Sequence, residues 1–258
     1  MNASLTPNLY ESLTLDEERA LYGITRATVK NCLFDGPADG ESALKEASDI
    51  TVESCEFRLR YPFWHVRGGR VVNSTLTDTC RAALWYAADM AIENTALGGI
   101  KALRECDRMT LTGCEIHSAE FGWLCRGVEL TDCKMAGEYP FFMTRGLHLR
   151  GVELKGKYSF QYIENADFDN CVFDTKDAFW HAKNVTVKNC NFTNNSGYWD
   201  DFENSSNAGA VGLYGINSKL INCIFDSNWV KSMDAVYGGA VQVGLDDPSY
   251  KALVYKCT

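Results

Sequence analysis

The chain has 258 residues, 46% of them hydrophobic, and carries a formal net charge of −9 at pH 7. A chain of this length and composition can bury a substantial core as one soluble domain. The negative charge argues against binding to nucleic acid or to an anionic membrane. The sequence has no apolar run long enough to span a bilayer, and the polar residues 1–19 do not resemble a secretory signal peptide.

A repeat of about 19 residues runs through most of the sequence. Its clearest copies are Val29–Phe34 and Val187–Phe192, in which an aliphatic and a polar residue precede a turn-forming residue and a small residue. The small residue recurs at positions 32, 55, 74, 95, 114, 133, 152, 171, 190 and 223, mostly at intervals of 19. Such a period is typical of a solenoid, in which each repeat buries its apolar face against its neighbours.

The segments between turn residues favour strands over helices, because they are four to six residues long and rich in Val, Ile, Phe and Trp. The residue before each small position is Asn, Asp, Gly or Ser, and these types tolerate a left-handed backbone or satisfy a sharp bend. Parallel crossovers are right-handed with few exceptions. The sequence therefore predicts an all-β fold, a right-handed parallel β-helix with coils of about 19 residues.

The period divides the chain into three parts. Residues 20–192 hold the regular coils, and residues 1–19 are expected to cap them, with a short helix over 9–18 protecting the first sheet edge. Residues 193–258 carry longer coils, since Cys223 and Cys257 lie 33 and 34 residues beyond the preceding small positions. The pattern stops inside a strand, so we expect either a piece of a longer solenoid or a recombined or engineered chain. We also expect either end-to-end self-association through the exposed edge or fraying from it.

Several stretches resemble an uncharacterised bacterial family of the domain-of-unknown-function kind, placed among the pectate-lyase-like right-handed β-helices. They are ERALYG (18–23), DGPADGESALKE (35–46), FRLRYPFWH (57–65), CRAALWY (80–86), GIKALREC (99–106) and KDAFWHAKN (176–184). The resemblance covers about residues 17–190. It implies the fold but brings no established activity or catalytic residues. Residues 191–258, with Asn-Cys-x-Phe and Gly-Ala-Val strands, instead resemble β-helix repeats of adhesin-like proteins.

Eleven cysteines are spread along the chain, and most occupy the small position of the repeat. Their odd number, the chain length and the lack of a secretion signal argue against a disulfide framework. Without a Cys-x-x-Cys pair, no zinc site is predicted. The interpretation we favour is a reduced ladder of small apolar side chains in a narrow core, typical of a cytoplasmic protein. The adhesin-like repeats instead favour a secreted or surface protein.

The candidate functional surface is an outward column about seven residues before each repeat. In coils 2 to 5 it combines aromatic and charged side chains, which could hold a sugar chain by ring stacking and charged hydrogen bonds. The candidate binding residues are Lys45, Glu46, Trp64, His65, Arg81, Trp85, Arg104, Glu105 and Trp123. In the alternative interpretation, Arg104 stacks between two tryptophans in a cation–π contact, and the column only stabilises the sheet.

Two functions from different classes follow. One is binding or processing of an acidic polysaccharide through the aromatic and basic face. The other is a non-catalytic structural scaffold or protein-interaction solenoid. An enzyme of this kind would be a polysaccharide lyase or a glycoside hydrolase. However, Glu46 and Glu105 lie three coils apart, roughly 14 Å at strand spacing, whereas glycosidase carboxylates lie about 5 to 9.5 Å apart. No catalytic residue, cofactor or metal is predicted.

Overall fold

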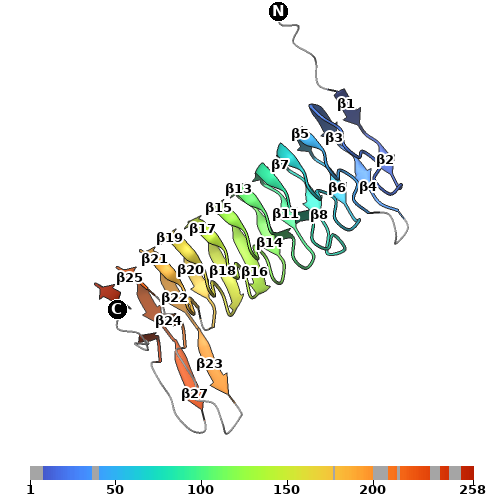
Figure 1. Cartoon of the computed structure of the whole chain (residues 1–258). Coiled ribbons are helices and arrows are strands. Elements are labelled where there is room, and N and C mark those ends of the chain that lie inside the picture. Colours follow the sequence, from blue (N-terminus) through green and yellow to red (C-terminus); the bar gives the residue numbers. More distant parts are fainter. Residues whose placement is uncertain are drawn as a thin grey trace, which may run out of the picture. The chain divides into compact units, whose positions relative to one another are not determined.

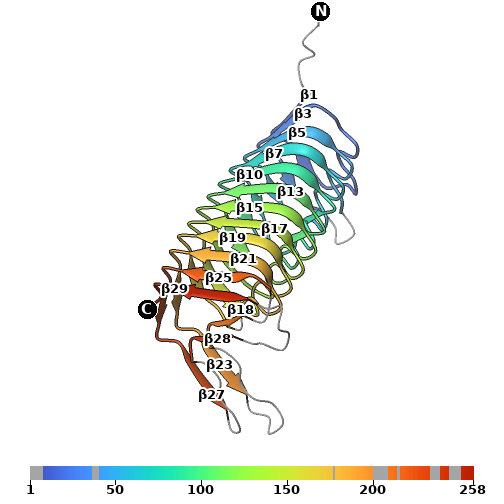
Figure 2. The same cartoon turned by 60° about the vertical axis from the view of Figure 1, so that its left-hand side comes forward.

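The computed structural model describes residues 8–36, 41–176, 178–199, 209–213, 216–232, 239–243 and 251–258. In these residues the chain is a parallel β-solenoid whose regular structure is all β, which confirms the predicted fold class (Figures 1 and 2). It divides into two compact units, Met1–Ser118 and Ala119–Thr258. In the part of the chain so described, no helix has the length and apolar character needed to cross a membrane.

In the first unit each coil contributes one strand to each of two parallel sheets. The longer strands follow the order β1 (Asn8–Glu11), β3 (Ala27–Lys30), β5 (Ser48–Glu53), β7 (Arg67–Val72), β10 (Ala88–Glu93) and β13 (Asp107–Thr112). The shorter strands follow the order β2 (Thr14–Leu15), β4 (Leu33–Phe34), β6 (Glu56–Phe57), β8 (Thr75–Leu76), β11 (Ala96–Leu97) and β14 (Glu115–His117). On the third side of the coil, β9 (Leu84–Trp85) pairs with β12 (Leu103–Arg104), and turns occupy this side in the neighbouring coils.

The second unit repeats this arrangement. Its longer strands are β15 (Arg126–Thr131), β17 (Arg145–Arg150), β19 (Glu164–Asp169), β21 (Lys183–Lys188), β25 (Ser218–Ile221) and β29 (Ala252–Tyr255). The shorter ones are β16 (Lys134–Glu138), β18 (Glu153–Lys157), β20 (Val172–Asp174), β22 (Asn191–Thr193) and β26 (Ile224–Asp226). The longer coils after Cys190 add two further pairs, β23 (Ser196–Trp199) with β27 (Trp229–Ser232), and β24 (Val211–Leu213) with β28 (Val241–Val243).

The corner between the two sheets confirms the predicted column of turn-forming residues. Asn31, Ser54 and Asn73 have φ angles of 52°, 54° and 50°. The same left-handed geometry recurs at Asn94, Gly113, Asp132, Gly151, Asn170, Asn189 and Asn222. A backbone in this region costs Asn, Asp and Gly less than other residues, so the composition of the column follows from the sharp bend.

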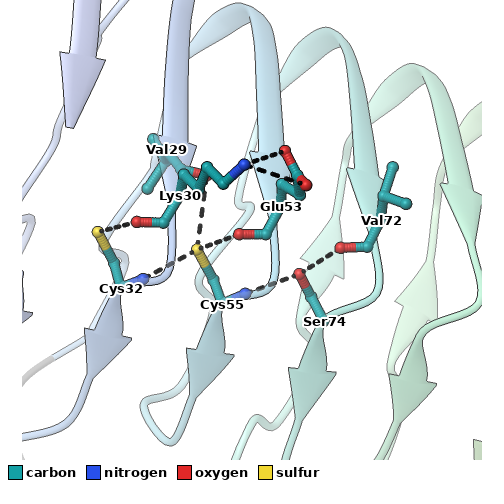
Figure 3. Close-up of polar contacts among 7 residues, drawn as sticks. All are labelled: Val29, Lys30, Cys32, Glu53, Cys55, Val72 and Ser74. Atoms are coloured by element: carbon teal, nitrogen blue, oxygen red, sulfur yellow. Dashed lines mark hydrogen bonds and ion pairs between the residues drawn. The ribbon is translucent and has the colours of Figure 1, made fainter. Parts of the chain in front are cut away.

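The small residues after this corner form a buried hydrogen-bonded ladder, shown for three coils in Figure 3. The Cys32 amide donates to Cys55 Sγ at 3.4 Å, and the Cys55 amide donates to Ser74 Oγ at 3.1 Å. Each side chain also donates to a carbonyl two residues earlier, for example Ser74 Oγ to the Val72 oxygen at 2.9 Å. These side chains are therefore more than the apolar filling that the sequence predicted, since they satisfy backbone groups at the corner.

The predicted helix over residues 9–18 is wrong, because this segment forms another coil of the solenoid. β1 and β2 pair in parallel with β3 and β4, and Tyr10 lies in register with Val29. Ser12 takes the left-handed corner with φ of 56°. The segment fits the 19-residue period, but Leu13 stands where later coils have a small residue. That substitution, together with three consecutive acidic residues, concealed the repeat.

Candidate functional site: the Lys45–Arg104 face

The Lys45–Arg104 face lies on the third side of the coil in the first unit. We define it by two adjacent columns of outward side chains, which are Lys45, Trp64, Trp85 and Arg104, followed by Glu46, His65, Tyr86 and Glu105. The residues that precede the first column, Leu44, Phe63, Leu84 and Leu103, are at most 1% exposed and fill the core. The alternation along this short segment therefore turns the first column outward, where its side chains are half-buried.

The first column forms a continuous stack along the coils. The Lys45 ammonium lies 4.0 Å from the centroid of the Trp64 ring. The rings of Trp64 and Trp85 stack with centroids 5.7 Å apart and planes 13° apart, and Arg104 Cζ lies 6.0 Å from the Trp85 centroid. Each indole thus has one face against the other indole, while a cation lies near its second face.

The two glutamates of the second column each accept a hydrogen bond from a tyrosine, Tyr22 or Tyr86. The Tyr22 hydroxyl donates to Glu46 Oε2 at 2.6 Å, and this hydrogen bond raises the pKa of Tyr22. A hydrogen bond to Glu105 likewise raises the pKa of Tyr86, because ionisation would place two negative charges side by side. The carboxylate of Glu105 also lies 3.1 Å from Arg104 Nε. Both glutamates on the face are therefore engaged by neighbouring side chains.

All four residues of the second column have a left-handed backbone. The φ angles of Glu46, His65, Tyr86 and Glu105 are 60°, 60°, 56° and 53°. The strain is compensated by a ladder of amides, in which those of Glu46 and His65 each donate to a carbonyl of the next coil at 2.9 Å. The second unit repeats this geometry at Leu124, Met143, Tyr162 and His181. It is therefore a property of the coil, and the strain does not mark a functional site.

The remaining predicted residues lie outside the stack. Arg81 is exposed and joins the face through its backbone, since its carbonyl accepts a hydrogen bond from the Tyr61 amide at 3.1 Å. Trp123 belongs to the second unit, where its ring centroid lies 5.0 Å from that of Phe142 and its indole donates to the Tyr139 carbonyl at 2.6 Å.

Sequence reasoning missed Tyr61. Its ring lies 5.8 Å from Trp64 and 6.0 Å from Trp85, so it belongs to the same aromatic cluster. Its place on the turn leading into the Trp64 column was the available signal. A bulky aromatic residue before a proline, however, gives no indication of which way it points. The cluster is therefore more aromatic than the two predicted columns alone.

Two cations on this side of the coil, Lys45 over the Trp64 ring and the exposed Arg81, have no carboxylate partner among the described residues. Among the residues that the structure describes, neither Lys45 nor Arg81 forms an ion pair. The indole N–H groups of Trp64 and Trp85 are shielded from solvent and donate to no acceptor among the described residues. In the same part of the chain, no three His, Cys, Asp or Glu side chains are placed to hold a metal ion. The face thus combines cations that form no ion pair in the described part of the chain with half-buried aromatic rings.

The fold defines the protein as a parallel β-solenoid. Its sequence matches a family model described as "Protein of unknown function (DUF3737)" over residues 8–206, and the chain belongs to that family. No curated protein matches the sequence.

The solved structures that resemble the chain are distant from it in sequence, and they include the following three. PfbA, a surface adhesin of Streptococcus pneumoniae, is 8% identical with a TM-score of 0.41, covering 97% of this chain and 70% of its own. The catalytic domain of a GH87 alpha-1,3-glucanase is 10% identical with a TM-score of 0.37, covering 96% and 63%. The periplasmic alginate epimerase AlgG is 9% identical with a TM-score of 0.30, covering 97% and 74%. These likenesses are too weak to carry an argument about function.

Proposed function

We propose that the protein binds an acidic polysaccharide through the Lys45–Arg104 face. The observation that carries this proposal is the Lys45 ammonium, which lies over the aromatic cluster of Tyr61, Trp64 and Trp85 and forms no ion pair with any described residue. Arg81, which forms none either, follows the same side of the coil through its backbone contact with Tyr61. The whole chain has a net charge of −9, so a site for a polyanion needs cations gathered locally. A polymer with regularly spaced carboxylates and apolar ring faces matches both parts of the surface.

The stack suggests how a sugar reaches the indoles. Trp64 and Trp85 cover each other, so the Trp64 face available to a ligand is the one under Lys45. An exposed cation–π contact is worth about 0.5 to 1 kcal/mol, and an exposed ion pair contributes a similar amount, about 0.2 to 1 kcal/mol. A sugar carboxylate can therefore draw the ammonium off the ring at little net cost. The uncovered indole face then stacks on the sugar ring.

The test is a titration of intrinsic tryptophan fluorescence with polygalacturonate, and with neutral dextran for comparison. We expect binding to polygalacturonate only, and weaker binding as salt rises. Changing Trp64 to Ala removes the ring on which the sugar stacks and should weaken binding by about 1 to 2 kcal/mol, comparable with other aromatic contacts. The matched control is Trp180→Ala, which removes an exposed tryptophan of the second unit. Equal binding of both polysaccharides would contradict the proposal.

Charge variants separate recognition from folding. Lys45→Gln and Arg81→Gln remove cations that make no ion pair among the described residues, so the melting temperature should hardly change. Affinity for polygalacturonate should fall for each, and further for the double variant. Retained affinity in the double variant would refute the assigned face.

The alternative function is a non-catalytic structural scaffold, and the covered indole faces favour it. In this case the stack of Lys45, Trp64, Trp85 and Arg104 serves only to hold successive coils together. The expected result for Trp85→Ala is then a lower melting temperature with no polysaccharide binding by the parent protein. The fluorescence titration and a thermal melt together distinguish the two functions.

A further inference from the structure

A Phe-Trp-His segment occurs twice in the chain, once in each unit. Phe63-Trp64-His65 belongs to the Lys45–Arg104 face, and Phe179-Trp180-His181 occupies the corresponding place in a coil of the second unit. In both copies the phenylalanine is at most 1% exposed and fills the core. Both histidines have a left-handed backbone, with φ angles of 60° and 52°. The same local geometry therefore turns both tryptophan–histidine pairs outward.

The second copy forms an aromatic platform with the two preceding coils. We define the Phe142–His181 platform by Phe142, Tyr162, Trp180 and His181. The rings of Tyr162 and His181 stack with centroids 4.9 Å apart and planes 19° apart. The Trp180 ring lies 5.4 Å from His181, and the Phe142 ring lies 5.6 Å from Tyr162. Tyr162 and Trp180 are 40% and 36% exposed, so the platform presents aromatic surface to solvent.

The platform also carries polar groups that have no partner within the described part of the chain. Neither the Tyr162 hydroxyl nor the His181 imidazole forms a hydrogen bond or an ion pair with a described residue. A ring with a polar group at its edge offers apolar surface and hydrogen bonding together. A sugar needs this combination, because its C–H groups pack against aromatic rings while its hydroxyls require hydrogen-bond partners.

The platform differs from the Lys45–Arg104 face in charge. Four of the eight residues in the two columns of that face are charged, whereas the corresponding columns of the second unit have no Lys, Arg, Asp or Glu. These second-unit columns are Trp123, Phe142, Gln161 and Trp180, followed by Leu124, Met143, Tyr162 and His181. Glu164 and Lys183, each two residues beyond a platform residue, form an ion pair with each other at 3.4 Å. An acidic polysaccharide therefore meets no lysine or arginine in these columns, and the charge pattern favours a neutral sugar.

We propose that the Phe142–His181 platform is a second carbohydrate-binding site, which takes a neutral oligosaccharide of β-linked glucose or a similar hexose. The inference rests on the proposed function, because it treats the related Lys45–Arg104 face as a sugar-binding surface. In β-linked glucose every ring substituent is equatorial, so each ring face carries only C–H groups and packs against the exposed surface of Tyr162 and Trp180. The Tyr162 hydroxyl and the His181 imidazole then bind hydroxyls at the edge of the sugar. The α-linkages of dextran place an axial oxygen on each ring, so dextran is not expected to bind here.

The test is a calorimetric titration with cellohexaose, a soluble oligomer of β-linked glucose. Calorimetry does not depend on Trp180 as a fluorescent reporter. The unaltered chain should bind the oligosaccharide, and Trp180→Ala should weaken binding about tenfold, the loss expected of one aromatic contact. His181→Leu should also weaken binding, because it removes a hydrogen-bonding group. Both side chains are exposed, so circular dichroism should show that both variants retain the fold.

Trp64→Ala is the matched control, because it removes the tryptophan of the other Phe-Trp-His segment. It should keep its affinity for cellohexaose and lose affinity for polygalacturonate, whereas Trp180→Ala should show the reverse. Weaker cellohexaose binding by Trp64→Ala and not by Trp180→Ala would overturn the assignment, since it would place the neutral sugar on the first unit.

The two ligands also keep this inference apart from the proposed function. Absence of cellohexaose binding by the unaltered chain would overturn the platform as a sugar site, even where polygalacturonate still binds. The exposed side chains of Leu124 and Met143 beside the platform would then favour a protein partner. Binding of cellohexaose without binding of polygalacturonate would instead contradict the Lys45–Arg104 face alone.

Discussion

The cysteine thiols lie in an interior lined by carbonyl oxygens. Cys55 Sγ donates to the carbonyls of Val29 and Glu53 at 3.5 and 3.3 Å, and Cys80 Sγ donates to that of Phe57 at 3.0 Å. Burial raises the pKa of Cys55 to about 11 and that of Cys80 to about 12. A thiolate here would lose solvation and face the negative ends of carbonyl dipoles. The reactive form is therefore scarcely populated at neutral pH.

This environment predicts the outcome of a thiol titration. In the folded protein at pH 8, few of the eleven cysteines should react with an aromatic disulfide reagent, since ten are buried. After denaturation without reductant, nearly all eleven should react. Several disulfides in the denatured sample would contradict the reduced ladder and the expected cytoplasmic location.

Arginine–carboxylate pairs link successive coils on the outer surface. Arg70 donates to both oxygens of Glu93, from Nε at 2.8 Å and Nη2 at 2.6 Å. These hydrogen bonds hold the pKa of Glu93 below its usual value. The stabilisation is therefore complete above the unfolded pKa of about 4.3 and is lost as pH falls through the lower folded pKa.

The titration of Glu93 predicts a pH-dependent variant effect. Glu93→Gln should lower the melting temperature at pH 7, and its difference from the unaltered chain should shrink below about pH 4. The matched control is Glu129→Gln, an exposed residue on β15 with no ion pair among the described residues. Melting curves between pH 2.5 and 7 measure both variants. A difference for Glu93→Gln that stays constant across this range would show that Arg70 does not act through the carboxylate.

At the scale of the element, aromatic stacks join the coils of the second unit. Phe160 lies 5.7 Å from Phe141 and 5.0 Å from Phe179, with ring planes 10° and 14° apart. Gly122 occupies the same column one coil earlier, where a Cβ atom would approach the Phe141 ring to 2.5 Å. The missing side chain at Gly122 is thus what gives the first ring its space.

Truncating the side chain at the centre of this stack should destabilise the fold most. Phe160→Ala should lower the free energy of unfolding by about 3 to 5 kcal/mol, because it removes a fully buried ring from between two others. Phe160→Leu should cost less, since it leaves a smaller cavity. Urea denaturation measures both, with Trp180→Ala as an exposed aromatic control. Equal losses for Phe160→Ala and the exposed control would mean that the coils do not depend on ring packing.

At the scale of the whole molecule, stability comes from contacts between neighbouring coils, so it depends on how many neighbours a coil has. The strands β15 to β22 have covered coils on both sides, whereas β29 has one described neighbour and exposed side chains. In a solenoid such an edge opens first, because opening it breaks one interface instead of two.

Hydrogen exchange should therefore be graded along the second unit. We expect the strongest protection at residues 119–192 and the weakest beyond residue 193. Uniform protection through to Tyr255 would show that the last described coil is stabilised by something other than its contact with β25.

The sequence predicts the features that depend on spacing. The 19-residue period predicted the parallel solenoid, and Asn31 and its equivalents predicted the left-handed corner. The same period brings Lys45, Trp64, Trp85 and Arg104 into one column, so the candidate face was also predictable.

The sequence does not predict features that depend on side-chain rotamers. It also does not predict a strained backbone conformation that hydrogen bonds compensate. No spacing reveals that Lys45 covers the Trp64 ring or that Tyr61 turns towards it. The left-handed corner at His65 and Tyr86 was missed because these residue types rarely adopt that backbone. The fold imposes it, because each of these amides donates a hydrogen bond to a carbonyl of the adjacent coil.

The constant coil length determines which insertions and deletions such a chain can accept during evolution. From Cys133 to Cys190, three successive coils have 19 residues each. Loss or duplication of one whole 19-residue coil joins equivalent backbone positions. The side-chain columns of the remaining coils therefore stay aligned. Loss of a single residue within a strand instead turns each following side chain of that strand to the opposite face. These side-chain columns can thus lengthen or shorten in steps of one strand spacing, about 4.8 Å, by recombination between repeats.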